Sequence, residues 1–449
     1  MDFIQKFIKE DLFKPSDIAS LIFFRICFGA LGVWEVIRFF YHGWVEHLYA
    51  KAPFHFKYEY FTWVEAWPGN GMHFHFLVVG VAAFFICIGF FYLISAVIFF
   101  LGYTYIFLVE RALYNNHYYL ICLLGFFLIL MPLNQNFSVD TLIWPSIRKN
   151  YVSSFWIWII RFQMSIVYIY GGFAKFDQDW LNGMAPRALI RIGAYETPIF
   201  NIIDYPIVNL FYAWSGLIFD LFIPFFLIYS RTRIYAFFAA LIFHIHNIFI
   251  FNIGIFPYMA ITLTLMYFPT DFPKRCLEFL KISTKQFEKS ETSTHANQPN
   301  SFIRSLVGVY SLWQLIFPFR HLATPGWTAW HQEGHLFSWR MMMVQKNVQM
   351  LFEIKNPHTE EVRYAPPEDY LNIPQVNKLA RNPDMILQYC HYIRDLVLKN
   401  AGFFPEILAT VKVGINGRDY KYFLKPDFGD NPSLNKASIS KKFIISLDY

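Results

Sequence analysis

The sequence predicts an α-helical polytopic membrane bundle of about nine transmembrane helices, followed by a small α+β extracytoplasmic domain. Three observations lead to this fold class. Of the 449 residues, 56% are hydrophobic and only 16% are charged, which is too apolar for an ordinary water-soluble domain. Several apolar stretches reach the roughly 20 residues that a helix needs to cross about 30 Å of hydrocarbon. The last third of the chain is more polar and contains short strand-like runs.

Nine apolar stretches are candidate spans. They cover residues 18–40, 74–90, 92–109, 117–133, 155–174, 206–229, 234–251, 255–269 and 302–318. We therefore divide the chain into a transmembrane helical domain at 1–319 and an extracytoplasmic α+β domain at 320–449. The first apolar run is too long for the core of a cleavable signal, so we expect the first span to act as its own anchor.

The formal charge of +6 indicates membrane topology and not nucleic-acid binding, because Lys and Arg form no basic stripe. By the positive-inside rule, a cytoplasmic N-terminus places four basic segments on the cytoplasmic side, and the C-terminal domain then lies outside, in a periplasm or lumen. These segments are Lys6–Lys14, Arg148–Lys149, Arg231–Arg233 and Lys274–Lys289. The polar stretch at 283–301 is expected to be a flexible cytoplasmic linker.

The outer domain is predicted from two strand pairs and one helix. Residues 348–355 and 361–364 flank Asn356-Pro357-His358, and residues 407–415 and 420–424 flank Asn416-Gly417. Asn-Gly is a strong hairpin signal. A helical pattern runs from Asp384 to Leu398.

Neither cysteine nor histidine spacing predicts a metal site. Cys390 is the one cysteine in the outer domain, which excludes a disulfide within it, and the chain has no CxxC. His244 and His246 are two residues apart on a predicted helix, so they point to different faces and cannot chelate together. The same holds for His73 and His75.

Ionisable residues inside spans have two interpretations. A charge in hydrocarbon is expensive, so each is a candidate functional group, or several pair with one another or with backbone inside the bundle. The residues in question are Arg25, Glu35, Arg38, Arg161, Asp220, His244 and His246.

The segment from Arg161 to Lys175 is the most informative of the spans. Arg161, Tyr168 and Lys175 are seven residues apart and share one helix face. Gly171 and Gly172 would let another backbone or a flat ligand approach closely. Lys175 lies where this helix reaches the outer surface, so it is either a functional amine or a lipid-snorkelling anchor.

A polar turn, Arg111 to His117, lies on the same outer surface between the third and fourth spans. Asn115, Asn116 and His117 enter a predicted helix there. They offer several hydrogen-bonding groups for a ligand, or one of them simply caps the helix.

Several motifs, in order, resemble the vitamin K-dependent gamma-glutamyl carboxylase family. They are RALYNNHYYL (111–120), NFSVD (136–140), GGFAKFDQDWLNG (171–183), FHIHN (243–247) with NIGIFP (252–257), QLIFPFRH (314–321), SWRMM (338–342) and VGINGR (413–418). The resemblance extends from about Ile18 to Pro426.

The resemblance implies a specific chemistry. Members of the family bind vitamin K hydroquinone in the membrane, and a lysine amine, here Lys175, deprotonates it for attack on O2. The oxygenated quinone removes a γ-hydrogen from a protein-bound glutamate, CO2 adds to the carbanion, and vitamin K epoxide leaves. No metal is implied. The partners are then membrane lipids, the reduced quinone and a glutamate-containing exported protein or peptide.

The resemblance also assigns the site. Lys175 and His117 are the predicted catalytic residues, and an apolar wall of Tyr168, Phe173 and Phe176 would favour the neutral amine and hold the quinol ring. His117 would hydrogen-bond a quinone oxygen. The predicted quinol-binding residues are Asn115, Asn116, His117, Tyr168, Gly172, His244 and Asn247. The predicted glutamate-binding residues are His335, Ser338, Trp339, Met341 and Arg418.

Three departures separate this chain from the animal enzymes. His335 replaces a tyrosine and Arg340 an aspartate in the glutamate-binding segment, and residues 41–72 lack the cysteine that joins the first outer loop to the outer domain. The long C-terminal extension of animal members is also missing. This indicates a compact, bacterial-type member, for which menaquinol rather than phylloquinol is the expected quinol.

Two alternatives follow from these departures. The protein would oxygenate the quinol but modify another substrate or none, because Lys175 matches while the glutamate segment diverges. Alternatively, it would be a non-enzymatic membrane protein that binds a quinone or a peptide.

Overall fold

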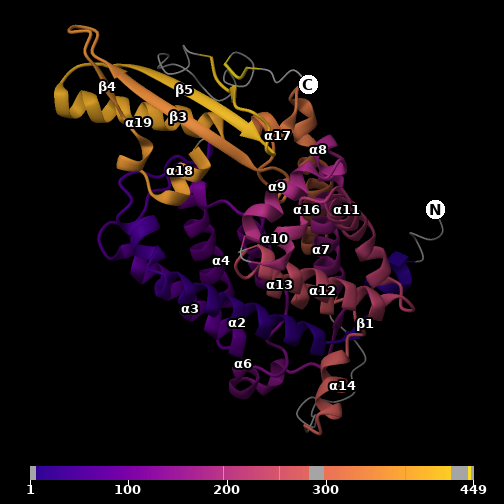
Figure 1. Cartoon of the computed structure of the whole chain (residues 1–449). Coiled ribbons are helices and arrows are strands. Elements are labelled where there is room, and N and C mark those ends of the chain that lie inside the picture. Colours follow the sequence, from indigo (N-terminus) through magenta and orange to yellow (C-terminus); the bar gives the residue numbers. More distant parts are fainter. Residues whose placement is uncertain are drawn as a thin grey trace.

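The computed structural model describes residues 7–195, 197–251, 253–282, 298–379, 381–425 and 443–445. It consists of a helical bundle with a small sheet-containing domain at one end (Figure 1). Most of the predicted linker, 283–297, lies outside the described residues. Ser301, the last residue of the predicted linker, is the first residue of a helix.

Within the residues that the structure describes, seven helices are long and apolar enough to cross a membrane. They are α2 (Ala19–Tyr41), α3 (Gly71–Ile88), α4 (Tyr92–Val109), α7 (Phe155–Ala174), α11 (Pro206–Ile228), α12 (Arg233–Ile250), and α16 (Ser301–Ile316) with its continuation η5 (Phe317–Ala323). The predicted number of about nine is not confirmed. Two further apolar helices, α5 (Asn116–Leu130) and α13 (Phe256–Leu265), have only 15 and 10 residues. At 1.5 Å per residue they are about 22 Å and 15 Å long, shorter than the hydrocarbon layer.

Shorter elements connect these helices. They are η1 (Phe7–Leu12), β1 (Pro15–Asp17), η2 (Glu46–Ala50), η3 (Arg111–Leu113), α6 (Val139–Ile143), η4 (Pro145–Ile147), β2 (Tyr151–Ser153), α8 (Gln178–Leu181), α9 (Met184–Gly193), α10 (Pro198–Ile202) and α14 (Phe272–Phe279).

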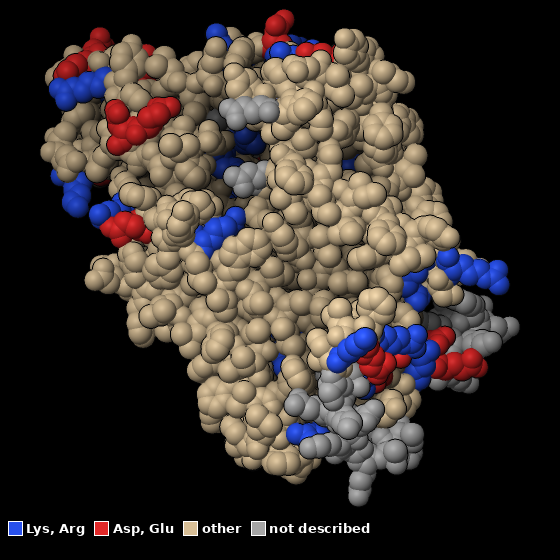
Figure 2. Space-filling view, turned by 60° about the horizontal axis from the view of Figure 1, so that its bottom comes forward, with Lys and Arg blue, Asp and Glu red and all other residues tan. Residues whose placement is uncertain are grey.

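The surface of the bundle is apolar. Large side chains such as Phe84, Ile242 and Phe249 are exposed on its helices. Figure 2 shows a broad middle region without Lys, Arg, Asp or Glu, with the charged residues gathered toward the ends. An exposed apolar belt of this size is unfavourable in water and fits a surface in contact with lipid.

Charges inside the bundle are matched by partners. Arg25, which is 1% exposed, donates from Nη1 to the carbonyl oxygen of Leu133 at 2.8 Å and from Nη2 to that of Phe137 at 2.5 Å. Arg38 pairs with Glu35 at 2.7 Å. Nε of Arg161 donates to the carbonyl oxygen of Met266 at 2.9 Å. For these residues, the interpretation as internal pairs is confirmed.

Three of the four basic segments meet at one end of the bundle. The strand β1 pairs antiparallel with β2, which brings Lys14 beside the segment that follows Arg148 and Lys149. Lys274 at the start of α14 pairs with Asp17 of β1 at 2.5 Å. Figure 1 shows α14 and α6 at the opposite end from the sheet domain. The described parts of these three segments therefore lie near one another, as the predicted topology requires of them.

The outer domain is built on a four-stranded antiparallel sheet in the order β4-β3-β5-β6. Its elements are α17 (Thr328–His331), β3 (Lys346–Lys355), β4 (Val362–Tyr364), η6 (Pro367–Asp369), α18 (Ile373–Leu379), α19 (Pro383–Ala401), β5 (Glu406–Ile415) and β6 (Lys421–Tyr422). Both predicted strand pairs and the predicted helix are confirmed. Asn416 and Gly417 have φ of 52° and 86°, the left-handed conformation that an Asn-Gly turn adopts.

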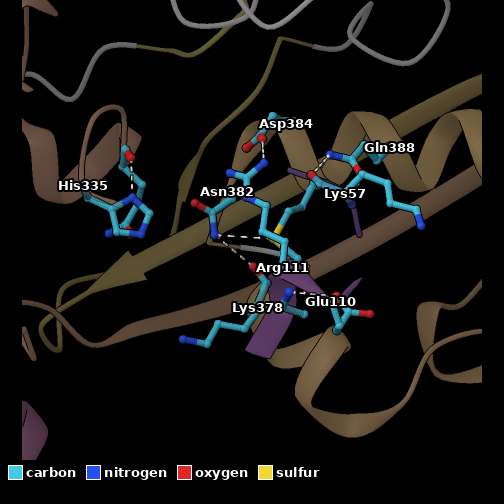
Figure 3. Close-up of polar contacts among 11 residues, drawn as sticks. Lys57, Glu110, Arg111, His335, Lys378, Asn382, Asp384 and Gln388 are labelled. Carbon is cyan, nitrogen blue, oxygen red and sulfur yellow. Dashed lines mark hydrogen bonds and ion pairs between the residues drawn. The ribbon is translucent and has the colours of Figure 1, made fainter. Parts of the chain in front are cut away.

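The outer domain docks on two loops of the bundle. Phe56, from the loop after α2, and Ala112 of η3 are part of the core of the outer domain. The Lys57 backbone N–H donates to Oε1 of Gln388 at 2.9 Å, and Nη1 of Arg111 pairs with Asp384 (Figure 3). The two domains are therefore held by shared core packing as well as by polar contacts.

Replacing Arg25 tests whether the buried pairs hold the bundle together. Arg25→Met leaves buried carbonyl oxygens without donors, and we expect it to lower the free energy of unfolding by about 3 kcal/mol. Arg275→Met, which removes an exposed pair with Asp271, should cost less than about 1 kcal/mol. Unfolding midpoints of the purified protein in detergent measure both. Equal shifts for the two variants would contradict this account of Arg25.

Candidate functional site

A cavity of about 1170 Å³ lies where the outer domain meets the bundle. Its inner walls come from α5, α7, α9, α11, α12 and α13. Its outer walls come from η3, α17, the segment 332–345 and the α18–α19 region. The apolar helices of the bundle and the outer domain therefore line the same cavity.

The inner part of the cavity is an apolar slot. Its walls include Val167, Phe219, Phe243, Phe256 and Met341. Phe219 and Phe243 stack with their ring centres 4.1 Å apart and 21° between the planes. Such walls suit a flat apolar ligand.

Lys175 follows the last residue of α7 and is buried in the cavity wall. Its Nζ lies 2.5 Å from Oδ2 of Asp220 and donates to the carbonyl oxygen of Gly171 at 3.1 Å, and each of the two charged side chains is 8% exposed. Nζ also lies 5.0 Å from the ring centre of Trp180. The alternative of a snorkelling anchor is therefore wrong, because the amine is engaged inside the protein.

The two glycines before Lys175 bring Asp220 to it. A Cβ at Gly172 would lie 2.7 Å from Cδ2 of Leu221 and 3.1 Å from its backbone nitrogen, so only glycine allows α11 to approach α7 this closely. A Cβ at Gly171 would lie 3.2 Å from Oδ2 of Asp220. Gly172 therefore admits a neighbouring backbone, and it does not line the cavity.

Histidine and tyrosine side chains supply polar groups in the slot. A hydrogen bond of 2.8 Å joins the hydroxyl of Tyr168 to Nε2 of His244. Within the part of the chain that the structure describes, Nδ1 of His244 and Nε2 of His117 are buried without a hydrogen-bond partner. An unpartnered buried ring nitrogen is costly. Both rings are therefore suited to bind a polar atom of a ligand.

Asn115 and Asn116 do more than begin a helix. Asn115 occupies the N-cap position of α5, but its side chain accepts no backbone N–H there. Asn116 accepts from the hydroxyl of Tyr114 at 2.9 Å and donates to the carbonyl oxygen of Arg340 at 3.3 Å. The simple capping interpretation is therefore wrong, and Asn116 connects the bundle to the outer segment.

The predicted residues divide into two groups by position. Those that line the cavity are Asn115, Asn116, His117, Tyr168, Lys175, His244, Asn247, His335 and Met341. Gly172, Ser338, Trp339 and Arg418 do not line it. Most of the quinol-binding residues that the resemblance implies therefore lie around one cavity, whereas three of the five predicted glutamate-binding residues lie outside its lining.

The outer residues that miss the cavity have other partners. The hydroxyl of Ser338 donates to the carbonyl oxygen of His335 at 2.6 Å. Trp339 is fully buried, and its Nε1 donates to Oε1 of Gln314 at 3.2 Å. Arg418 forms a two-point ion pair with Asp179, with Nη2 to Oδ1 at 2.6 Å. These contacts hold the side chains of Ser338, Trp339 and Arg418 away from the cavity, whereas Met341 lines it.

The predicted aromatic wall around Lys175 needs correction. Phe173 and Phe176 are 46% and 60% exposed and do not line the cavity. Helical geometry explains this, since Phe173, two residues before Lys175, and Phe176, one residue after it, point in other directions at the end of a helix. The walls come instead from Phe219 and Phe243 of α11 and α12.

His244 and His246 have different partners, as their spacing predicts. His244 contacts Tyr168, and Nε2 of His246 lies 3.0 Å from the hydroxyl of Tyr212. Among the described residues, no group of three or more His, Cys, Asp or Glu side chains could hold a metal ion.

Sequence reasoning missed two features of the cavity. Asp220 was recognised only as a charge within a span, because nothing in the linear sequence connects it to Lys175. Lys378 and Arg381 line the outer half of the cavity. The sequence did not indicate a role for them, because basic residues next to a helix are common in a water-soluble domain.

Together, the apolar belt, the spanning helices and the covering domain define a multi-pass membrane protein with a lumenal-type domain. Two family models match the chain. The HTTM domain matches residues 13–272, and the lumenal domain of the vitamin K-dependent gamma-carboxylase matches residues 299–444. The two matches together cover most of the chain, so the protein belongs to the vitamin K-dependent gamma-carboxylase family. No solved structure matches it.

His335 gives the outer half of the cavity a testable pH dependence. Burial, followed by the cations Arg111 and Lys378, lowers the pKa of His335 from 6.5 to about 3. Its Nδ1–H donates to the carbonyl oxygen of Gln332 at 2.5 Å. Between pH 6.5 and 3, the unfolded chain therefore binds a proton at this residue that the folded chain does not bind.

Stability should consequently fall as the pH drops below 6.5, by up to about 1.4 kcal/mol per pH unit from this residue. His335→Gln removes the titrating group, and we expect its stability to depend less steeply on pH between 6.5 and 4.5. Unfolding free energies of both proteins at several pH values measure the difference. Parallel pH curves would contradict a buried neutral His335.

Proposed function

We propose that this membrane protein is a quinol-dependent gamma-glutamyl carboxylase, which couples oxygenation of vitamin K hydroquinone to the epoxide with carboxylation of a protein-bound glutamate by CO2. The observation that carries the proposal is the buried Lys175–Asp220 pair in the wall of an apolar cavity. When bound, the quinol would react with O2 and supply the strong base that removes the γ-hydrogen of glutamate.

The residues in the slot fit a quinol. Its ring is flat and apolar, and the stacked Phe219 and Phe243 provide a matching wall. Its two oxygens need hydrogen-bond partners, and the unpartnered nitrogens of His117 and His244 lie in this wall. Menaquinol or phylloquinol would also carry an apolar tail, for which the exposed side of α12 is suitable.

Lys175 would take the proton from a hydroxyl group of the quinol. An amine accepts a proton only when it is neutral, and an isolated ammonium is disfavoured in apolar surroundings. A proton that moves between Nζ and Oδ2 of Asp220 leaves the net charge of the pair unchanged. Asp220 would therefore act as a positioning residue that aims the amine and shares its proton.

His117 would stabilise negative charge on the oxygen that loses its proton. A neutral imidazole donates one N–H, and in a cavity of low polarity such a donor acts more strongly than in water. The Tyr168–His244 hydrogen bond fixes the second ring at the other side of the slot.

The two substrates would enter from different sides. The quinol reaches the slot from the membrane, and a glutamate-containing exported protein or peptide reaches it from the outer domain. The N-terminus would be cytoplasmic and the outer domain periplasmic or lumenal, in agreement with the basic end opposite that domain.

A second candidate is a quinol oxygenase without glutamate carboxylation. The position of Ser338, Trp339 and Arg418 away from the cavity favours it. A single assay separates the two functions. Membranes receive reduced vitamin K, O2 and labelled bicarbonate, with and without a glutamate peptide.

We expect label in the peptide together with epoxide. Epoxide without label would support the second candidate, and quinol binding without either product would contradict both. In the same assay, Lys175→Ala should lower epoxide formation at least about 100-fold, the range expected for loss of a general base. Arg191→Ala, which removes an exposed partner of Asp204, is the matched control and should retain activity. Full turnover by Lys175→Ala would exclude Lys175 as the base.

Asp220 has its own prediction. Asp220→Asn keeps a hydrogen-bonding group near Nζ but cannot share a proton, so we expect kcat for epoxide formation to fall about tenfold or more with little change in the KM for quinol. Asp220→Glu should restore part of the rate. A rise in KM at unchanged kcat would show that Asp220 serves only to shape the pocket.

A further inference from the structure

Two lysines line the cavity, and their surroundings differ. Lys175 lies beside the carboxylate of Asp220, with 2.5 Å between Nζ and Oδ2. Lys378, in α18, lies in the outer half, where Arg340 and Arg381 also line the cavity. Among the described residues, no carboxylate forms an ion pair with any of these three. The amine of Lys175 is therefore matched by an anion, and that of Lys378 is not.

The amine of Lys378 is accessible from the cavity. Figure 3 shows its side chain extended away from Glu110 and Arg111, with no interaction drawn at its nitrogen. The backbone N–H of Arg381 donates to the carbonyl oxygen of Lys378 at 3.1 Å, so a tight turn holds the two residues close together. Nε of Arg381 is buried without a hydrogen-bond partner in the described chain. An open amine therefore lies near a guanidinium group with an unused donor.

The surroundings of Lys378 also make its amine reactive. Burial, and then repulsion from Arg381, lower the pKa of Lys378 from 10.5 to about 8. About a tenth of this amine is then neutral at pH 7. Only the neutral form has an electron pair to donate, and a neighbouring cation is one of the ways in which proteins activate a lysine as a nucleophile.

A low pKa alone does not distinguish Lys378, because Lys346 shares it. Burial lowers the pKa of Lys346 well below 10.5. However, Lys346 is 3% exposed and does not line the cavity. Its Nζ donates to the carbonyl oxygens of Trp330 and Arg381, the second at 3.2 Å. Lys378 therefore differs from Lys346 in its access to a small molecule that enters the cavity.

We propose that Lys378 is a carbamylation site, at which CO2 binds covalently and reversibly to the amine inside the cavity. The neutral Nζ donates its electron pair to the carbon of CO2, a C–N bond forms, and one C–O π electron pair moves to oxygen. The nitrogen then releases a proton to a buffer base in solution. The product is a carbamate anion, and nothing is oxidised or reduced.

The charge of the outer half favours this product. The reaction turns the three positive charges of Lys378, Arg340 and Arg381 into two positive charges and one negative charge. Guanidinium groups are suited to the two oxygens of a carbamate, as they are to those of a carboxylate. At Lys175, in contrast, the carboxylate of Asp220 would repel a second anion. Lys378 is therefore the cavity lysine at which a carbamate is stabilised.

The carbamate does not rest on the proposed function, because it requires only dissolved CO2. CO2 is small and uncharged, so it enters a partly apolar cavity without the large desolvation cost of an ion. If the proposed function is correct, the same carbamate holds a molecule of CO2 in the cavity where carboxylation takes place.

The test traps the carbamate on the full-length protein in detergent, without quinol or O2. The protein is equilibrated with carbon-13 bicarbonate at a pH near the pKa of Lys378. It is then treated with triethyloxonium tetrafluoroborate, which converts a carbamate into a stable ethyl ester, and mass spectrometry of its peptides locates the label. We expect label at Lys378 and none above background at Lys346 or at Lys399, an exposed residue of α19.

Three variants check the assignment. Lys378→Arg keeps the positive charge but lacks the amine, so the label in this segment should disappear. Arg381→Gln should lower the label at Lys378 about threefold or more, because the amine becomes more protonated and the carbamate loses a stabilising cation. Lys399→Arg is the matched control, and it should leave the label at Lys378 unchanged.

The measurement on the unmodified protein decides the proposal even if a variant does not fold. Absence of label at Lys378 at saturating bicarbonate would overturn the carbamate, and so would equal label at Lys378 and Lys399. Label at Lys378 in a protein that does not carboxylate a glutamate peptide would support the carbamate and contradict the proposed function. Carboxylated peptide from a protein without label at Lys378 would support the proposed function and overturn the carbamate.

Discussion

Charge buried in an apolar protein must be matched, and the structure of this chain depends on how that condition is met. Only 16% of the residues are charged, yet several lie inside the bundle. Each of these is compensated in a different way: Arg25 by backbone carbonyl oxygens, Arg38 by a carboxylate one turn earlier, and Lys175 by a carboxylate from another helix. Because a partly matched charge would cost several kcal/mol, these contacts determine how the helices are arranged.

The Lys175–Asp220 pair shows how this condition links packing to the proposed chemistry. It forms only because Gly171 and Gly172 let α11 approach α7, and it places an amine beside an apolar slot. Buried charge is also matched where the two domains meet, since Arg111 pairs with Asp384. The animal enzymes resembled by this chain use a disulfide between the first outer loop and the outer domain. Here, Phe56 packs into the outer core and Lys57 hydrogen-bonds Gln388, so the contact is non-covalent.

The sequence was sufficient for the parts of the fold that depend on local patterns. Alternating residues and Asn416-Gly417 predicted the β5–β6 hairpin, because turn type and strand periodicity are local properties. Hydropathy predicted apolar helices at α5 and α13 but not their lengths of 15 and 10 residues, because helix ends depend on packing as well as on hydropathy. Tyr168 and Lys175 were predicted to share a helix face, and both line the cavity. Asp220 was not linked to them, because helix-to-helix approach is set by tertiary packing. Phe173 and Phe176 were misplaced for a local reason, because the neighbours of Lys175 at the end of a helix point in other directions.

The outer half of the cavity differs from the inner half in how its charged groups are matched. In the inner half, polar groups are paired or present single ring nitrogens, as suits a nearly neutral ligand with two oxygens. In the outer half, Arg340, Lys378 and Arg381 have no carboxylate partners among the described residues. If each half is matched only when its ligand is bound, the cavity as a whole is electrostatically complete only with both ligands present. The arrangement would then favour the simultaneous occupancy that the proposed coupled reaction requires, because the carboxylate of a glutamate substrate offsets positive charge in the outer half.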